Sequence, residues 1–467
     1  MHGLMVPDTF VFLLAAFHPC FTAPSHANFQ LLVAGWVHCL GRRTITAVAL
    51  ASGAVGTRHI SAFHRFFSRA RWNLDAIGRV LFTLAMGWIP TDQPLYVLID
   101  DTLARKAGKC IALGSMHHDP LLSTGRKPFF HFGHVWVVLA LWVPLPMGGR
   151  RGFALPLLFR LYVGAKRGGK ADAPSRPGAG KRSQAATKAA AGAPTCRRTK
   201  LELARDLIAL VAQWAPARSI FMVCDSAYAA STLLEARPAN VHVISRLRMD
   251  AALWTSPPPR RPGDKGRPRK KGRRLPNPQA IAVQCRKWRS LPVTIYGRQV
   301  TTRSFSFTAL WYSALPDHPI RIVVVRDPSG KRKDEAFFCT DLTMTPTCIL
   351  EGFARRWTIE VAFHDSKQFL GFANPQSQAE TAVLRTAPIA FVVYDLVLLW
   401  YADQVHHGTA PTWVLRPWYR GKSTPSFLDM LTGLRHTGWL RFSQPSRHAQ
   451  GPQNSRAAWT QALLATA

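Results

Sequence analysis

The chain has 467 residues, of which 47% are hydrophobic and 10% aromatic, so a wholly disordered protein is excluded and more than one domain is expected. Sixty Lys and Arg residues against 25 Asp and Glu residues give a formal net charge of +35. A surplus of this size predicts a polyanionic partner, and nucleic acid is the commonest.

Other classes of protein are disfavoured by local patterns. The eight cysteines are scattered without C-x-x-C spacing, which argues against a zinc ribbon and fits reduced thiols in a cytosol. The N-terminus lacks the basic region and cleavage site of a signal peptide. The most apolar segments, Val135–Pro144 and Ala387–Tyr401, are shorter than the roughly 20 residues of a membrane span. We therefore expect a cytoplasmic protein that binds no membrane.

Residues 1–90 carry helical spacing and are predicted to form an N-terminal helical DNA-binding domain. Thr44–Ser52 and Ser61–Arg71 are short helix candidates joined by a Gly-containing turn, which suggests a helix-turn-helix with its second helix in a DNA groove. The alternative is a helical bundle in which the aromatic residues are simply core. Those residues are Phe63, Phe66 and Phe67.

Residues 91–245 are predicted to form the first part of an α/β catalytic domain. Within them, residues 164–197 are rich in Gly, Ala, Lys, Arg, Ser and Pro and are expected to be a flexible basic insert. No Gly-rich segment has the context of a P-loop, so no nucleotide cofactor is expected. The predicted strands are Leu95–Ile99, Val135–Trp142, Phe153–Val163, Ile220–Cys224 and Val241–Ser245; the helices are Lys200–Trp214 and Ala227–Ala236; and His117-His118-Asp119 is expected in a loop.

Residues 246–345 are β-rich and broken by basic loops, so they are interpreted as an insertion into that domain. The most basic segment is Arg260–Arg274, whose side chains are predicted to contact DNA phosphates. The residues chosen for this role are Arg267, Arg269, Lys270 and Lys271.

The second part of the catalytic domain is assigned to residues 346–405, and residues 406–467 to a C-terminal tail. The predicted strands of the insertion are Val293–Tyr296, Thr301–Trp311, Ile320–Val325 and Ala336–Thr340, and the helices that follow are Pro346–Trp357, Glu360–Phe369, Ala379–Tyr401 and Ser426–Leu434.

Acidic residues are scarce, and candidates lie at the ends of two buried strands. Asp101 follows Leu95–Ile99 by two positions, and Asp225 follows Ile220–Cys224. Neighbouring carboxylates are costly unless a cation neutralises them, and hard divalent ions prefer such oxygen ligands. Each Asp could instead only cap the turn that follows. Asp100 is a competing candidate because successive side chains on a strand point to opposite faces.

A third acid lies on a predicted helix. Arg356, Glu360 and Lys367 are spaced by four and then seven residues, and so share one helical face. The cluster could be a salt-bridged surface stripe. It could equally be a metal ligand whose flanking cations hold DNA phosphates.

At this point the sequence resembles the insertion-sequence DDE transposases with a β-rich insertion. Their Y-x-x-R-x-x-x-E-x-x-x-x-x-x-K signature is matched by Arg356, Glu360 and Lys367, with Phe353 in place of the tyrosine. Their first and second acids are matched by Asp101-Thr102 and Asp225. The resemblance implies an RNase H-like mixed sheet with flanking helices, in which Asp101, Asp225 and Glu360 are the catalytic metal ligands.

The resemblance also implies an activity. The chain would bind two Mg²⁺ or Mn²⁺ ions, cut DNA at transposon inverted repeats and join the ends to target DNA, with Arg356 and Lys367 on the DNA backbone. It would act as a homodimer in the DNA complex of a bacterial cell. The alternative is a DNA-binding protein derived from a transposase that has no catalytic activity, and a nuclease of the same fold is a third possibility.

Overall fold

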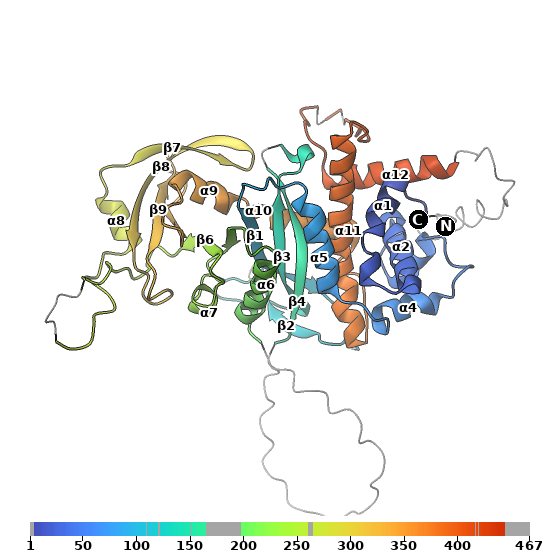
Figure 1. The fold of residues 1–467 in the computed structure, drawn as a ribbon, viewed down its shortest axis with the longest axis horizontal. Helices are drawn as coiled ribbons and strands as arrows, with labels where there is room; N and C mark the ends of the chain where they lie inside the picture. Colours follow the sequence, from blue (N-terminus) through green and yellow to red (C-terminus); the bar gives the residue numbers. More distant parts are fainter. Residues whose placement is uncertain are drawn as a thin grey trace, which may run out of the picture.

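The computed structural model describes residues 4–443 except 109, 120–121, 150, 165–197, 260–264, 416 and 419. It shows a mixed α/β protein in which a large mixed sheet is flanked by helices (Figure 1). Most of the predicted basic insert, part of Arg260–Arg274 and the end of the C-terminal tail lie outside the described residues.

The N-terminal segment is helical, as predicted, and packs around aromatic side chains. Its helices are α1 (Asp8–Ala15), α2 (Ala23–His38), α3 (Ile45–Ala51), α4 (Ile60–Ser68) and α5 (Leu74–Met86). The two helix candidates of the sequence are confirmed by α3 and α4. The three phenylalanines of α4 are buried, so they are core residues, while His64, Arg65 and Arg69 are exposed on its other side. An amphipathic α4 leaves a basic face available to solvent.

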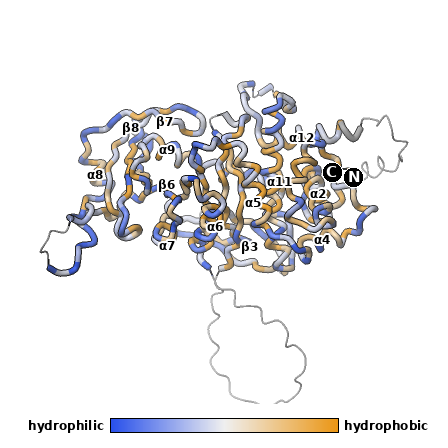
Figure 2. Tube along the Cα trace, in the orientation of Figure 1, coloured by the Kyte–Doolittle hydropathy of each residue, from blue (hydrophilic) through white to orange (hydrophobic). Residues whose placement is uncertain are grey.

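The sheet has a central arrangement consistent with an RNase H-like fold. Strand β1 (Leu95–Arg105) is parallel to β5 (Ile220–Cys224), which is parallel to β6 (Val241–Leu247). On its other side β1 pairs antiparallel with β3 (Phe130–Val143), which also pairs with β4 (Phe153–Tyr162) and β2 (Ser115–His118). The buried strands are continuous apolar runs, as expected of strands covered on both faces (Figure 2).

The β-rich segment after β6 extends this sheet. Its strands are β7 (Arg289–Ile295), β8 (Arg298–Ala309), β9 (Ile320–Arg326) and β10 (Glu335–Cys339). Strand β10 pairs antiparallel with β6, so that within the described residues ten strands form one sheet. A short helix, α8 (Pro278–Gln284), precedes β7. The predicted insertion is thus joined to the core by a continuous backbone ladder.

Helices cover the two faces of the sheet. Helix α6 (Lys200–Trp214) lies on one face with α5, whose Asp75 pairs with Arg160 of β4. Helices α9 (Pro346–Ala354), α10 (Trp357–Leu370) and α11 (Glu380–His406) lie on the other, where Phe159 of β4 stacks on Phe391. The last described helix is α12 (Phe427–Ser443).

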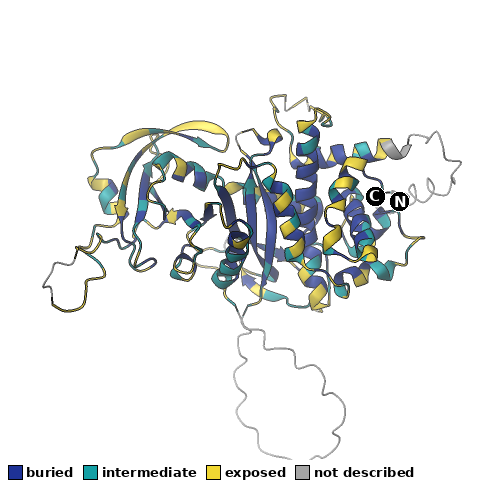
Figure 3. Ribbon diagram, in the orientation of Figure 1, coloured by how far each residue is buried: buried dark blue, intermediate teal, exposed yellow. Residues whose placement is uncertain are grey.

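Helix α11 is buried along most of its length (Figure 3). By length and composition it could cross a membrane, but 89% of its most apolar window is buried inside the fold. It contacts β4 as well as α1, α2, α4 and α12. Its Arg385 donates hydrogen bonds to the carbonyl of Phe67, in the last turn of α4, and to those of Ala70 and Trp72, just after the helix. The N-terminal helices are therefore docked on the same core as the sheet.

Some local predictions were wrong. Strand β1 does not end at Ile99, because β3 continues to pair with it as far as Arg105. His117 and His118 lie in strand β2 rather than a loop, since they pair with His131 and Phe130. Of Ala227–Ala236 only α7 (Ser231–Leu234) is helical.

Candidate active site

Strand β1 sends its two neighbouring aspartates to opposite faces of the sheet. Asp100 and Asp101 both lie inside the strand, paired across from Val138 and Val137 of β3. Because side chains alternate along a strand, one carboxylate faces α10 and the other faces α6. The contacts of each side chain show which is which.

Asp100 faces α10 and is joined to Glu360 through Arg356. The guanidinium donates from Nη1 to Oδ2 of Asp100 at 3.0 Å, and its Nη2 lies 2.6 Å from Oε1 of Glu360. Arg356 immediately precedes α10, and Glu360 lies one turn further along, as the sequence spacing indicated. A strand residue and a helix residue far apart in sequence thus meet at one cation.

Asp225 lies next to Asp100 at the end of β5. The parallel ladder ends at the pair Ile99–Cys224, so Asp100 and Asp225 are the next residues on the two strands. Their side chains follow those of Leu98 and Val223, which share one face. The charge of Asp225 raises the pKa of Asp100, although less than burial does, as expected of two neighbouring carboxylates.

The environment of Asp100 strongly disfavours its charged form. Burial raises its pKa to about 7, against the opposing effects of the Asp101 N–H bond and of Arg356. Asp101 and Asp225 add to the increase. A single guanidinium therefore leaves this group of carboxylates incompletely neutralised, which is the electrostatic condition for holding a further cation.

Asp101 faces the opposite side and already has two partners. Its Oδ2 accepts from Nζ of Lys200, at the start of α6, at 2.7 Å. Its Oδ1 accepts from the hydroxyl of Tyr228 at 2.9 Å. The structure therefore brings Asp100, Asp225 and Glu360 to one face and places Asp101 on the other, although the sequence favoured Asp101 over Asp100.

Lys367 extends the basic face of α10. The residue as a whole is exposed, but burial of its ammonium lowers its pKa, and the charge of Arg105 lowers it further. Phe353, which stands where the signature has tyrosine, lies under the Arg356 guanidinium at 5.8 Å and packs on Phe337. The ring thus supports Arg356 even without a hydroxyl.

The donor set of the site fits a hard divalent cation. Asp100, Asp225 and Glu360 offer only carboxylate oxygens, which Mg²⁺ and Mn²⁺ prefer. With the guanidinium between Asp100 and Glu360, however, no group of three or more His, Cys, Asp or Glu side chains in the described ranges is close enough to hold a metal ion. Binding of a cation here requires the Arg356 side chain to shift.

The described part of the basic loop of the insertion is largely exposed. Arg267, Arg269 and Lys270 are exposed. Lys271 differs, because its ammonium lies 3.8 Å from the ring centre of Trp254 and 4.6 Å from that of Tyr312. Three of the four residues of this loop that were predicted to contact DNA are thus exposed enough to reach a phosphate, while the fourth packs on two aromatic rings at the base of the loop.

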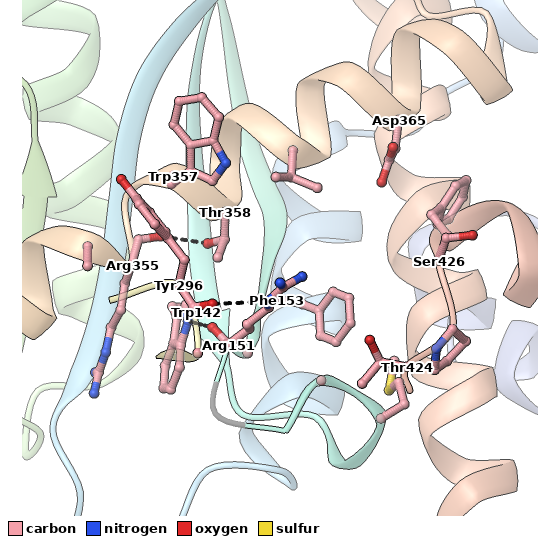
Figure 4. A pocket seen from close by; sticks show the side chains of 18 of the residues that line it. Trp142, Arg151, Phe153, Tyr296, Arg355, Trp357, Thr358, Asp365, Thr424 and Ser426 are labelled. Atoms are coloured by element: carbon pink, nitrogen blue, oxygen red, sulfur yellow. Dashed lines mark hydrogen bonds between the residues drawn. The ribbon is translucent and has the colours of Figure 1, made fainter. Parts of the chain in front are cut away.

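A pocket of about 690 Å³ lies on a different side of α10 (Figure 4). Thr358, Val361 and Asp365 line it from the helix, and this stripe is separate from the Arg356–Glu360–Lys367 stripe. The tip of the β7–β8 hairpin closes it, where Nε of Arg151 donates to the carbonyl of Tyr296 at 3.2 Å. This pocket is therefore distinct from the carboxylate site.

Two residues of this region had no signal in the sequence. The pattern around Lys200 indicates only an amphipathic helix, and that around Tyr228 only a helix. Their role depends on which face of β1 carries Asp101, which is a property of the packed sheet. The one hint in the sequence is that Tyr228 follows Asp225 by three residues.

Comparison with known proteins gives one family match. A model described as DDE superfamily endonuclease matches residues 16–306, which is more than half of the chain. The matched range contains Asp100, Asp101 and Asp225, and it ends before Glu360. No curated protein matches the chain.

Proposed function

Because the chain belongs to the DDE superfamily endonucleases, we propose that it is a DNA transposase that cuts transposon ends and joins them to target DNA. Membership implies a DNA substrate, and endonucleases of this superfamily typically use divalent metals. The proposal adds that the substrates are inverted repeats, that the ions are two Mg²⁺ or Mn²⁺, and that a homodimer holds both ends.

The observation that carries the proposal is the convergence of Asp100, Asp225 and Glu360 on one face of the sheet. We assign the metal ligands to these three residues, with Asp100 in place of Asp101, because Asp101 is engaged by Lys200 and Tyr228 on the other face. Two divalent ions bound there would activate water and stabilise the leaving oxygen.

The surrounding cations fit the DNA backbone. Arg356 orients the carboxylates of Asp100 and Glu360, and with Lys367 it places positive charge along one side of α10. Arginine and lysine in this position can bind the phosphates on either side of the bond that is cut. The exposed Arg267, Arg269 and Lys270 would hold DNA further away, on the insertion.

The N-terminal helices are proposed to bind DNA as well. The exposed side of α4 carries His64, Arg65 and Arg69, while its buried side anchors the helix in the core. This arrangement suits a helix that enters a groove or lies along a phosphate backbone.

The test uses the DNA that flanks the gene of this protein. The full chain is incubated with Mn²⁺ and an oligonucleotide duplex carrying the inverted repeats found there. Cleavage and joined products are expected from the wild-type chain and from Asp250→Asn, an exposed acid paired only with Arg248. Asp100→Asn, Asp225→Asn and Glu360→Gln should each abolish both products.

Other results would identify the alternatives. Specific binding of the duplex without cleavage by the wild-type chain would indicate a DNA-binding protein without catalysis. Cleaved ends without joined products would indicate a nuclease. Full activity in all three acid variants would refute the proposed site.

A further inference from the structure

We infer that Asp101 is a positioning residue, which acts through Tyr228 to hold the turn that carries Asp225 beside Asp100. The inference rests on the proposed function, since it assumes that Asp225 and Asp100 are used together.

Asp225 needs such support because no strand ladder holds it. It is the first residue after β5, beyond the last ladder pair, Ile99–Cys224. Its own contacts are local to the turn: Oδ1 accepts from the N–H of Ala227 at 2.8 Å, and its carbonyl accepts from the N–H of Tyr228 at 3.2 Å. These bonds fix the shape of the turn but not its position relative to β1.

The Tyr228 hydroxyl supplies the missing link. Tyr228 is 3% exposed, and its hydroxyl donates to Oδ1 of Asp101 at 2.9 Å. Burial raises the pKa of Tyr228, and the charge of Asp101 and the hydrogen bond to it raise it further. The phenol therefore keeps its proton and remains the donor throughout the neutral pH range.

The carboxylate of Asp101 that accepts this hydrogen bond is itself held in place through its second oxygen. Lys200 binds Oδ2 at 2.7 Å from the first turn of α6, so the carboxylate is held from both sides. Asp101 thus connects β1, α6 and the turn after β5. Since β1 carries Asp100 at the adjacent position, a shift of the turn changes the distance between Asp225 and Asp100 directly.

This geometry predicts a specific pattern of defects. Tyr228→Phe keeps the ring and removes only the donor, so Asp225 loses its link to β1. A misplacement of about 1 Å can cost on the order of 10²-fold in rate. We expect single-turnover cleavage to slow between about tenfold and about a hundredfold, and Mn²⁺ binding, measured by EPR titration without DNA, to weaken. Affinity for DNA in EDTA should not change.

Substitutions of Asp101 separate positioning from metal binding. In Asp101→Asn the amide oxygen still accepts from Tyr228, so this variant should cut faster than Asp101→Ala. The double variant Asp101→Ala/Tyr228→Phe should be no slower than Asp101→Ala, because both changes break the same bond. Lys200→Gln leaves the hydrogen bond between Tyr228 and Asp101 in place, so it should slow cleavage less than Tyr228→Phe does.

Tyr401→Phe is the matched control. Tyr401 is also almost fully buried, and its hydroxyl donates to the Pro411 carbonyl at 2.9 Å, a contact that involves none of the three acids. The Tyr401→Phe variant should have a lower free energy of unfolding than the wild type and the same affinity for Mn²⁺.

The outcomes are distinct. Wild-type Mn²⁺ affinity and cleavage in Tyr228→Phe would overturn the inference. So would an Asp101→Asn variant as inactive as Asp100→Asn, because Asp101 would then behave as a ligand. A wild-type chain that cuts none of its own flanking DNA would refute the proposed function, and the Mn²⁺ titrations would still decide whether Tyr228 positions the acids.

Discussion

Arg356 joins Asp100 to Glu360, with one guanidinium nitrogen 3.0 Å from the strand carboxylate and another 2.6 Å from the helix carboxylate. A planar guanidinium can bind both at once, whereas the ammonium of lysine is a single point of charge. The contact therefore fixes α10 relative to β1 in a way that charge alone would not.

The first prediction concerns this contact. Arg356→Lys should slow single-turnover DNA cleavage on the order of 10²-fold, because the guanidinium, once a divalent ion has displaced it from Asp100 and Glu360, is proposed to bind the phosphates next to the bond that is cut. Arg205→Gln, which removes a half-buried arginine of α6 on the other face of the sheet, should cut at the wild-type rate. An Arg356→Lys variant with full activity would show that the forked guanidinium is not needed for cleavage.

The second prediction concerns pH. The pKa of Asp100 is raised to about 7 in the folded chain, from an ordinary value of 3.8. The stability linked to this group is therefore complete below about pH 4 and is lost as the pH rises through about 7. In EDTA, Asp100→Asn should be more stable relative to the wild type at pH 8 than at pH 4, measured by denaturant unfolding. A difference independent of pH would contradict the prediction.

The third prediction concerns the basic loop. The triple variant in which Arg267, Arg269 and Lys270 are each replaced by glutamine should depend less steeply on salt. Each phosphate that is no longer neutralised reduces the slope of log affinity against log salt concentration by about 0.9, so the three changes should reduce it by about 2 to 3. Lys271→Gln should instead lower the Tm, because its ammonium packs on Trp254 and Tyr312. An unchanged slope in the triple variant would mean that the loop does not bind phosphate.

The fourth prediction concerns the packing of α5 on β4. A Cβ at Gly78 would lie 2.3 Å from the carbonyl oxygen of Leu157, which belongs to the backbone and cannot move aside. Gly78→Ala should cost about 1–3 kcal/mol, despite the better helix propensity of alanine. At Gly87 the nearest atom is 3.5 Å away, so Gly87→Ala should have little effect on the Tm.

The sequence predicts the bounds of helices and strands best where residues close together in the chain determine them. Helix α6 and strand β5 begin and end as expected, because Thr199 and Glu202 form a capping box and Ile220–Cys224 is an unbroken apolar run. The Arg356–Glu360 pair is likewise local, at i and i+4.

The choice between Asp100 and Asp101 could not be made in this way. Alternation shows that the two side chains point apart, but the face that receives α10 is decided by tertiary packing. The deciding contact, between Arg356 and Asp100, spans 256 residues. The extension of β1 beyond Ile99 was missed for a similar reason, since it depends on pairing with β3.

The pairing of β6 with β10 has a consequence for how the chain could be shortened. Leu247, at the end of β6, is the ladder partner of Ala336, at the start of β10. The segment between them therefore leaves and re-enters the core at points about 5 Å apart, the spacing of neighbouring strands. A short turn is long enough to join these two points, but such a cut would also remove β7, on which α9 packs through the hydrogen bond from the Thr294 N–H to Glu351, and β9, the other neighbour of β10.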